Sequence, residues 1–146
     1  MKNFVDKKIL EYVQNKTSEE SNILNDLSRE THLKVLNPRM LSGHYQGRLL
    51  SLISKLIKPK SILEIGTYTG YSTLCLIEGL EKKGLIHTID HNEELLNIQN
   101  KFFKRAKVSN RIKQYTGDAK EIIKNLEVKF DLIFIDADKE NYSLYY

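Results

Sequence analysis

Disulfide bonds and membrane-spanning segments are excluded by what this sequence lacks. It has one cysteine, Cys75, so no internal disulfide can form, and the apolar stretch STLCLIEGL around it predicts a buried thiol. No apolar run approaches the roughly 20 residues that a bilayer-crossing helix needs. The first 16 residues, MKNFVDKKILEYVQNK, scatter charges along their length, which is unlike a secretory signal. We therefore expect a cytoplasmic protein without a membrane partner.

Strong charge of one sign is also missing, apart from one basic run. The formal net charge is +4, and 40% hydrophobic and 29% charged residues are typical of one globular domain. The basic run contains no acid and consists of Lys101, Lys104, Arg105, Lys107, Arg111 and Lys113. Such a run is usually a solvated helix face, and the alternative is a contact with a polyanion such as RNA or a coenzyme A tail.

Residues 1–60 have the spacing of helices. Two helices are predicted over 4–16 and 19–36, the second with Thr17 and Glu20 as a candidate capping box. After Pro38, the stretch MLSGHYQG leads into a third amphipathic helix, which Pro59 closes. The apolar positions that mark this third helix are Leu49, Leu52, Ile53, Leu56 and Ile57. We expect these helices to form a cap and to supply the segment that leads into a ligand cleft.

Residues 61–146 alternate between strand and helix patterns. The expected strands are 61–66, 84–90, 111–117 and 130–136, and the expected helices are about 70–82, 92–107 and 118–126. This alternation predicts an α/β fold, a Rossmann-like parallel sheet with helices on both faces, which together with residues 1–60 forms one domain. The last strand, FDLIFID, is apolar enough for a sheet centre, yet the sequence ends at Tyr146. We therefore expect it at a sheet edge, with poor solubility or self-association.

A glycine turn follows the first expected strand, in the residues LEIGTYTGYS (63–72). The spacing E-x-G-x-x-x-G lacks the dinucleotide pattern G-x-G-x-x-G and the Gly-Lys-Ser/Thr ending of a phosphate loop, so neither a pyrophosphate nor a triphosphate is the natural ligand. S-adenosylmethionine fits better. Its carboxylate suits a helix start and Ser72, its ammonium suits Glu64, and its adenosine needs close backbone approach at Gly66.

Two further strand ends complete a candidate adenosine site. Asp90 ends the second strand, about two dozen residues after Gly66, which is the register of an acid that binds both ribose hydroxyls. The alternative for Asp90 is a helix cap. After the third strand, Asp118 can accept a hydrogen bond from the adenine amino group, and the Ala119 N–H can meet a ring nitrogen.

The fourth strand runs into Asp136, Asp138 and Lys139. Two carboxylates this close repel each other, share a cation or are balanced by the lysine, and oxygen ligands suit Mg²⁺, Mn²⁺ or Ca²⁺. The alternative is that Asp136 only ends the strand, Asp138 caps the next helix and Lys139 is exposed. The four histidines show no metal-ligand spacing.

These motifs, taken in order, resemble the cation-dependent O-methyltransferases, the family of caffeoyl-CoA O-methyltransferase and catechol O-methyltransferase. The matching stretches are Met40-Leu41-Ser42-Gly43 with Gln46-Gly47, LEIGTYTGYS, TIDHN, GDA and FIDADKENY, which span about residues 38–142. The resemblance implies a class I S-adenosylmethionine-dependent methyltransferase fold and a homodimer of the full-length protein.

The resemblance also implies site residues. The cofactor would be bound at its cleft wall by Met40 and Ser42, at its methionine end by Glu64, Gly66, Thr67 and Ser72, at its ribose by Asp90, and at its adenine by Asp118 and Ala119. Asp136 would be a metal ligand, Asp138 would lie near cofactor or substrate, and Lys139 matches the general base of the catechol enzymes. Family members continue through further strands with a second metal-binding pair, Asp-Asn, which this chain lacks before Tyr146.

We therefore expect an S-adenosylmethionine-dependent, divalent-metal-assisted O-methyltransferase of a small catechol-like or hydroxycinnamoyl-type phenolic acceptor, with its C-terminal strands and part of its metal site missing. A tRNA hydroxyuridine acceptor is one alternative, which the basic run would suit. The other alternative is a binding-only module that retains cofactor affinity without turnover.

Overall fold

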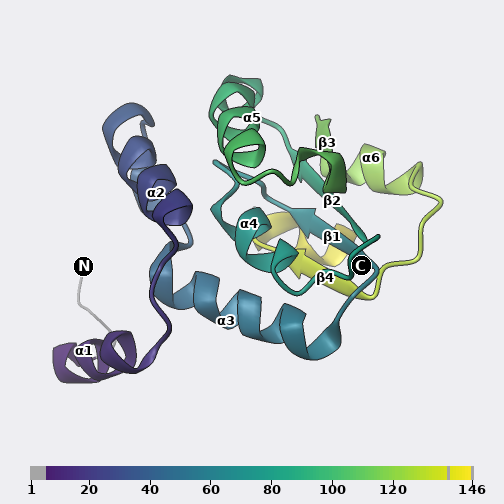
Figure 1. Cartoon of the computed structure of the whole chain (residues 1–146). Helices are drawn as coiled ribbons and strands as arrows, with labels where there is room; N and C mark the ends of the chain where they lie inside the picture. The colour runs from purple at the N-terminus through teal and green to yellow at the C-terminus, as the bar shows by residue number, and fades with distance from the viewer. Residues whose placement is uncertain (1–5, 138, 146) are drawn as a thin grey trace.

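Four short strands form a parallel sheet in the computed structural model, which describes residues 6–137 and 139–145. They are β1 (Ser61–Ile65), β2 (Leu85–Asp90), β3 (Ile112–Thr116) and β4 (Leu132–Ile135), in the order β3-β2-β1-β4 (Figure 1). β1 pairs with β2 on one side and with β4 on the other. The strand order therefore reverses beside β1, and ligands of open parallel sheets bind in the crevice at such a point. The α/β prediction is confirmed, and each predicted strand is present within two residues of its expected ends.

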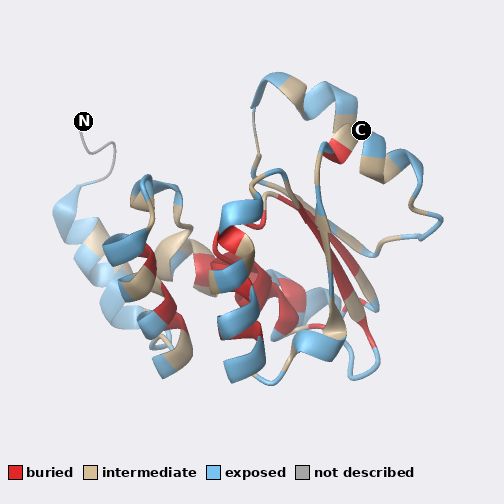
Figure 2. Cartoon of the chain, turned by 90° about the horizontal axis from the view of Figure 1, so that it is seen from above, coloured by how far each residue is buried: buried red, intermediate tan, exposed pale blue. Residues whose placement is uncertain are grey.

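Helices follow each strand and cover both faces of the sheet. They are α4 (Tyr71–Ile77), α5 (Leu96–Arg105, after a 3₁₀ turn at Glu93–Leu95), α6 (Ala119–Lys124), and a 3₁₀ turn (Lys139–Asn141) with α7 (Tyr142–Tyr145). A further 3₁₀ turn, Ser109–Arg111, precedes β3. Two core clusters lie on opposite faces, one around Ile62, Ile86 and Phe102, the other around Leu63 and Ile65. Figure 2 shows this burial concentrated in the sheet and the helices against it.

The N-terminal part consists of α1 (Lys7–Lys16), α2 (Asn22–Lys34), a 3₁₀ turn (Pro38–Met40) and α3 (Gly43–Ile57). The predicted capping box is wrong. The cap of α2 is Ser21, whose hydroxyl accepts from the Leu24 N–H, because the helix begins at Asn22. The Thr17 hydroxyl instead donates to the carbonyl oxygen of Val13, and Glu20 accepts a hydrogen bond from the Tyr71 hydroxyl.

α3 packs against α4 through small residues. Its buried positions are Gly47, Leu50, Ser51 and Ser54. A Cβ added at Gly47 would lie 2.6 Å from the Tyr71 ring and 2.8 Å from the Cys75 sulfur. The two helices therefore approach closely, and the apolar residues that predict α3 from the sequence lie on its opposite, exposed side.

Among the described strands, β4 lies at an edge of the sheet, as expected, since it pairs with β1 alone. Ile133 of this strand is 54% exposed. Over residues 6–137 and 139–145, no helix combines the length and the apolar character needed to cross a membrane.

Candidate functional site

A cleft of about 1390 Å³ opens at the carboxyl ends of the strands. Its walls come from the ends of β1, β2, β3 and β4, from α5, and from the segment that joins α2 to α3. The predicted site residues that line it are Met40, Ser42, Gly66, Thr67, Ser72, Asp90, Asp118, Ala119 and Asp136. The parallel strands thus bring together motifs from Gly66 to Asp136, which are 70 residues apart in sequence.

Two predicted residues, Glu64 and Lys139, stand apart from this cleft, and a third lies outside the described residues. Glu64 and Lys139 are not among the described residues that line it. Lys139 is exposed, in the 3₁₀ turn that follows β4. Asp138 lies outside the described residues, so its predicted role stays a prediction.

The glycine turn brings β1 and β4 into close contact. Gly66 has φ +104°, and a Cβ there would lie 2.4 Å from the carbonyl oxygen of Asp136. Gly70, which caps α4 with φ +92°, would place a Cβ 2.6 Å from the Phe103 ring. Both positions therefore require glycine for backbone conformation and for space.

Glu64 lies beneath the cleft and is fully buried. Its carboxylate accepts hydrogen bonds from the hydroxyls of Ser72 (2.5 Å) and Thr73 (2.5 Å) on α4 and of Thr88 (2.6 Å) on β2. Burial raises the pKa of Glu64 to about 7, against the lowering effect of these hydroxyls. Successive side chains of a strand point to opposite faces of the sheet. Glu64 therefore points to the α4 face, while Leu63 and Ile65 join the core of the other face.

Glu64 and Ser72 contact each other, and their predicted contacts with a ligand stay predictions. Ser72 lines the cleft, and its hydroxyl donates to Glu64. Glu64 thus joins α4 to the floor of the cleft through hydroxyl groups.

Asp90 holds the glycine turn from the end of β2. One carboxylate oxygen accepts from the Tyr68 N–H at 2.6 Å, and the other accepts from the Asn92 N–H at 2.9 Å. The cap of the following 3₁₀ turn is Asn92, not Asp90. At the end of β3, Asp118 caps α6 by accepting from the Lys120 N–H at 2.9 Å, and this places Ala119 at the cleft.

Tyr68 is a cleft residue that the sequence reasoning missed. It has φ +49°, which is uncommon for a residue other than glycine. Besides the bond to Asp90, its carbonyl oxygen accepts from the Gln99 side chain at 2.6 Å, and its hydroxyl donates to the Asn37 carbonyl oxygen at 2.8 Å. Tyr68 therefore ties the glycine turn to α5 and to the segment before α3, and no pattern of residue types reveals such a conformation.

Asp136 is exposed, beyond the carboxyl end of β4. The Gln46 side-chain nitrogen lies 3.5 Å from one of its carboxylate oxygens. The described residues contain no group of three or more histidine, cysteine, aspartate or glutamate side chains able to hold a metal ion. The role of Asp136 as a metal ligand therefore stays a prediction.

The basic run is partly occupied by internal contacts. Lys101 pairs with Glu30 at 2.5 Å, and Arg105 pairs with Asp26 at 2.6 Å, so both join α5 to α2. Arg111 donates to two backbone carbonyl oxygens at 2.8 Å. Half of the run thus holds the fold together, which favours a structural interpretation over a polyanion contact.

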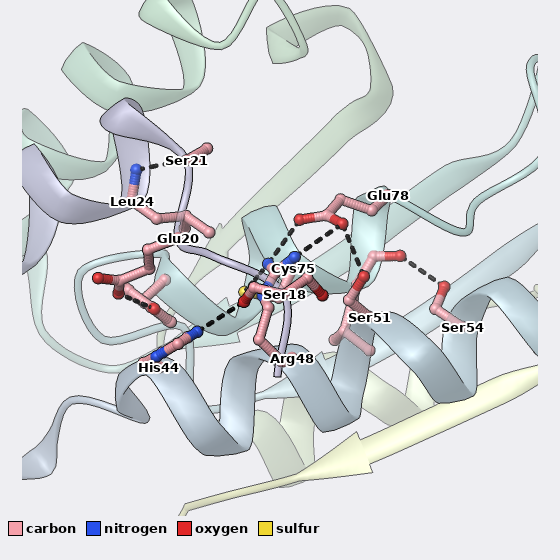
Figure 3. Close-up of polar contacts among 12 residues, drawn as sticks. Ser18, Glu20, Ser21, Leu24, His44, Arg48, Ser51, Ser54, Cys75 and Glu78 are labelled. Carbon is pink, nitrogen blue, oxygen red and sulfur yellow. Dashed lines mark hydrogen bonds and ion pairs between the residues drawn. The ribbon is translucent and has the colours of Figure 1, made fainter. Parts of the chain in front are cut away.

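A second polar cluster lies between α3 and α4, away from the cleft (Figure 3). Arg48 donates to both carboxylate oxygens of Glu78 at 2.6 and 3.1 Å, and Ser51 and Lys55 also donate to Glu78. Partial burial alone would raise the pKa of Glu78, but the hydrogen bonds from Arg48, Lys55 and Ser51 lower it to about 2. Cys75 beside Arg48 is buried, as predicted.

Comparison with known proteins identifies the family and several relatives of this chain. The model of a family described as O-methyltransferase matches residues 14–146. An O-methyltransferase from Aspergillus hancockii is 44% identical over 89 residues, which cover 60% of this chain and 35% of that protein. A catechol O-methyltransferase from Niastella koreensis is 36% identical over 105 residues, which cover 69% and 48%. The chain thus spans about half or less of the length of these relatives.

Two solved structures share the fold. A methyltransferase from Podospora anserina, solved with S-adenosylhomocysteine (SAH) bound, superposes with a TM-score of 0.89 at 31% identity and covers 94% of this chain and 59% of that one. An O-methyltransferase from Bacillus cereus, also in complex with SAH, has a TM-score of 0.84 at 30% identity, with coverages of 94% and 66%.

Proposed function

Because the chain belongs to the O-methyltransferase family, we propose that its cleft binds S-adenosylmethionine and that the protein transfers the methyl group to an oxygen of a small acceptor. One observation carries this proposal: the glycine turn, Asp90, the Asp118–Ala119 pair and Asp136 meet in one cleft. The two SAH complexes of similar fold support the choice of ligand.

The cofactor would lie along the carboxyl edge of the sheet. We assign its ribose hydroxyls to Asp90 and its adenine to Asp118 and the Ala119 N–H. Its methionine end would lie over Gly66, Thr67 and Ser72, with Met40 and Ser42 on the opposite wall. Glu64 would support this end indirectly, because its carboxylate holds Ser72 and Thr73 at the start of α4.

Asp136 is the residue we assign to a divalent cation, Mg²⁺, Mn²⁺ or Ca²⁺. A single carboxylate with water ligands is an arrangement that Mg²⁺ accepts. A bound cation would lower the pKa of an acceptor hydroxyl toward neutrality. The role of Lys139 as general base stays a prediction from the resemblance, since this exposed lysine does not line the described cleft.

The acceptor class rests on the relatives. Proteins similar to this chain are named catechol and caffeoyl-CoA O-methyltransferases, so we propose a small phenolic acceptor. A tRNA acceptor has less support, because Lys101, Arg105 and Arg111 are held in internal contacts.

Calorimetry with S-adenosylmethionine, followed by an assay of methyl transfer to catechol with and without Mg²⁺, tests this function. We expect saturable cofactor binding and methylated catechol that depends on Mg²⁺. Binding without turnover on any phenol would support the binding-only alternative for this chain. Absence of cofactor binding would refute the proposal.

A further inference from the structure

The hydroxyl of Ser72 stands between a buried carboxylate and the cleft. Ser72 lines the cleft at the start of α4 and is 4% exposed. Its hydroxyl donates to Oε1 of Glu64 at 2.5 Å. An ionised carboxylate only accepts, and a serine hydroxyl has a single proton, so that proton points to Glu64. Toward the cleft, Ser72 then offers lone pairs alone and has no proton to donate to a ligand.

The other hydroxyls around Glu64 are fixed by the same proton count. Oε2 of Glu64 accepts from Thr73 at 2.5 Å and from Thr88 at 2.6 Å. The Thr88 hydroxyl also lies 2.5 Å from that of Thr67. Thr67 must be the donor of this pair, because Thr88 already donates its one proton to Glu64. Oε2 thus accepts two hydrogen bonds from buried threonines, and Oε1 accepts one, from Ser72 at the cleft.

A ligand carboxylate at Ser72 would change this count. Because a carboxylate only accepts, Ser72 would have to turn its proton to the ligand. Its oxygen and Oε1 of Glu64 would then lie 2.5 Å apart without a proton between them, and two carboxylates would share one hydroxyl. Like charges at such a distance raise the pKa of one of them strongly. A proton on Oε1 removes both conflicts, since Glu64 then donates to Ser72, while Oε2 still accepts from Thr73 and Thr88.

We propose that Glu64 takes up a proton from solvent when the carboxylate of S-adenosylmethionine binds at Ser72, and that the neutral carboxyl holds the Ser72 hydroxyl as a donor to the cofactor. This inference rests on the proposed function, which places the methionine end of the cofactor at Ser72. Glu64 is accordingly a positioning residue, because it acts through Ser72 from beneath the cleft.

The surroundings of Glu64 favour this proton. Glu64 is fully buried, and the three groups that donate to it are neutral hydroxyls. The titratable groups that face it are Asp90 on β2, whose negative charge also raises the pKa of Glu64, and the buried Cys75 thiol on α4. On β4 its neighbour in the sheet is Phe134, which does not titrate. The pKa of Glu64 is about 7, so near neutral pH the free chain is partly ionised at this position.

Calorimetry of the unchanged chain with S-adenosylmethionine in PIPES and in imidazole tests the proton uptake. The two buffers differ in ionisation enthalpy, so the difference in binding heat counts the protons. We expect Glu64 to take up about 0.8 proton per bound cofactor at pH 7.5 and about 0.1 at pH 6, because it is mostly ionised at the higher pH and mostly protonated at the lower. The dissociation constant should rise about fourfold over the same range.

Glu64→Gln and Glu78→Gln are matched variants. Glutamine at position 64 keeps an acceptor for Thr73 and Thr88 and supplies a permanent N–H donor to Ser72, as the neutral carboxyl does. This variant should bind at both pH values with the affinity that the unchanged chain has at pH 6. The uptake it lacks relative to the unchanged chain belongs to Glu64, since protons bound by the cofactor itself are common to both. Glu78→Gln changes a carboxylate away from the cleft and should keep the uptake.

Binding by the unchanged chain without proton uptake at pH 7.5 would overturn this proposal and leave the proposed function in place. Equal uptake in the unchanged chain and in Glu64→Gln would do the same. Net release of a proton from Glu64 would also overturn it, because the ammonium of the cofactor would then be the group at Ser72. Absence of cofactor binding at both pH values would refute the proposed function and this inference with it. Thermal unfolding checks the fold of both variants, and the comparison of buffers on the unchanged chain needs neither.

Discussion

Replacing Asp90 by asparagine is expected to weaken S-adenosylmethionine binding by roughly 30-fold. The side chain of Asp90 is 14% exposed and ends at the cleft, where we assign it to both ribose hydroxyls. Asparagine retains one acceptor oxygen but loses the charge and the second acceptor. A hydrogen bond to a charged group contributes about 1.5 to 3 kcal/mol, so the loss of one is about 2 kcal/mol in binding.

Part of this effect could come from the glycine turn, because Asp90 also accepts the N–H groups of Tyr68 and Asn92. Asp131 is a suitable control. Its carboxylate also accepts two backbone N–H groups, those of Lys60 (2.7 Å) and Ser61 (3.1 Å), at the opposite end of the sheet.

Calorimetric titration and thermal unfolding of Asp90→Asn and Asp131→Asn separate binding from folding. We expect both variants to lose some stability and only Asp90→Asn to lose cofactor affinity. Unchanged affinity in Asp90→Asn, or an equal loss in Asp131→Asn, would refute the assignment of the ribose to Asp90.

Three other changes test the packing of the fold and of the cleft. Burial raises the pKa of Glu64 to about 7, so the folded state holds a proton that the unfolded state releases near pH 4.5. The free energy of unfolding should therefore fall by up to about 3 kcal/mol as the pH rises from 4.5 to 7. In urea titrations at a series of pH values, Glu64→Gln should reduce this dependence on pH. Gly66→Ala should abolish cofactor binding in calorimetry, since the added Cβ would overlap the backbone at the end of β4. Gly43→Ala is the control and should retain cofactor binding, because Gly43 also has a positive φ (+73°) but has open space around its Cβ. Glu78→Gln should destabilise the fold by about 2 kcal/mol in chemical unfolding near neutral pH, because Arg48 loses its ion pair with the Glu78 carboxylate. Equal stability of this variant and the unchanged chain would contradict a stabilising role of the ion pair.

The fold and much of the cleft could be predicted because they depend on the order of the strands and helices and on the spacing of apolar residues. Alternating strand and helix patterns leave few arrangements besides a parallel sheet, whose carboxyl ends meet at one edge. Asp90 ends a strand and Gly66, Asp118 and Asp136 each follow one, so topology alone brings them together.

The remaining features depend on packing that the sequence does not display. The buried side of α3 consists of small residues apart from Leu50, so hydrophobic periodicity identifies the helix but misplaces its contacts. Strand alternation turns Glu64 toward α4, and its bonds to the hydroxyls there depend on packing that residue types alone do not reveal. The positive φ of Tyr68 results from its contacts with α5 and the segment before α3.

A crystal structure of this chain with S-adenosylhomocysteine tests the central claim most directly. We expect the ribose hydroxyls within hydrogen-bond distance of the Asp90 carboxylate, the adenine beside the Ala119 N–H, and the homocysteine end above Gly66. A ligand bound elsewhere, or one whose ribose does not contact Asp90, would contradict the assignment of this cleft to the cofactor.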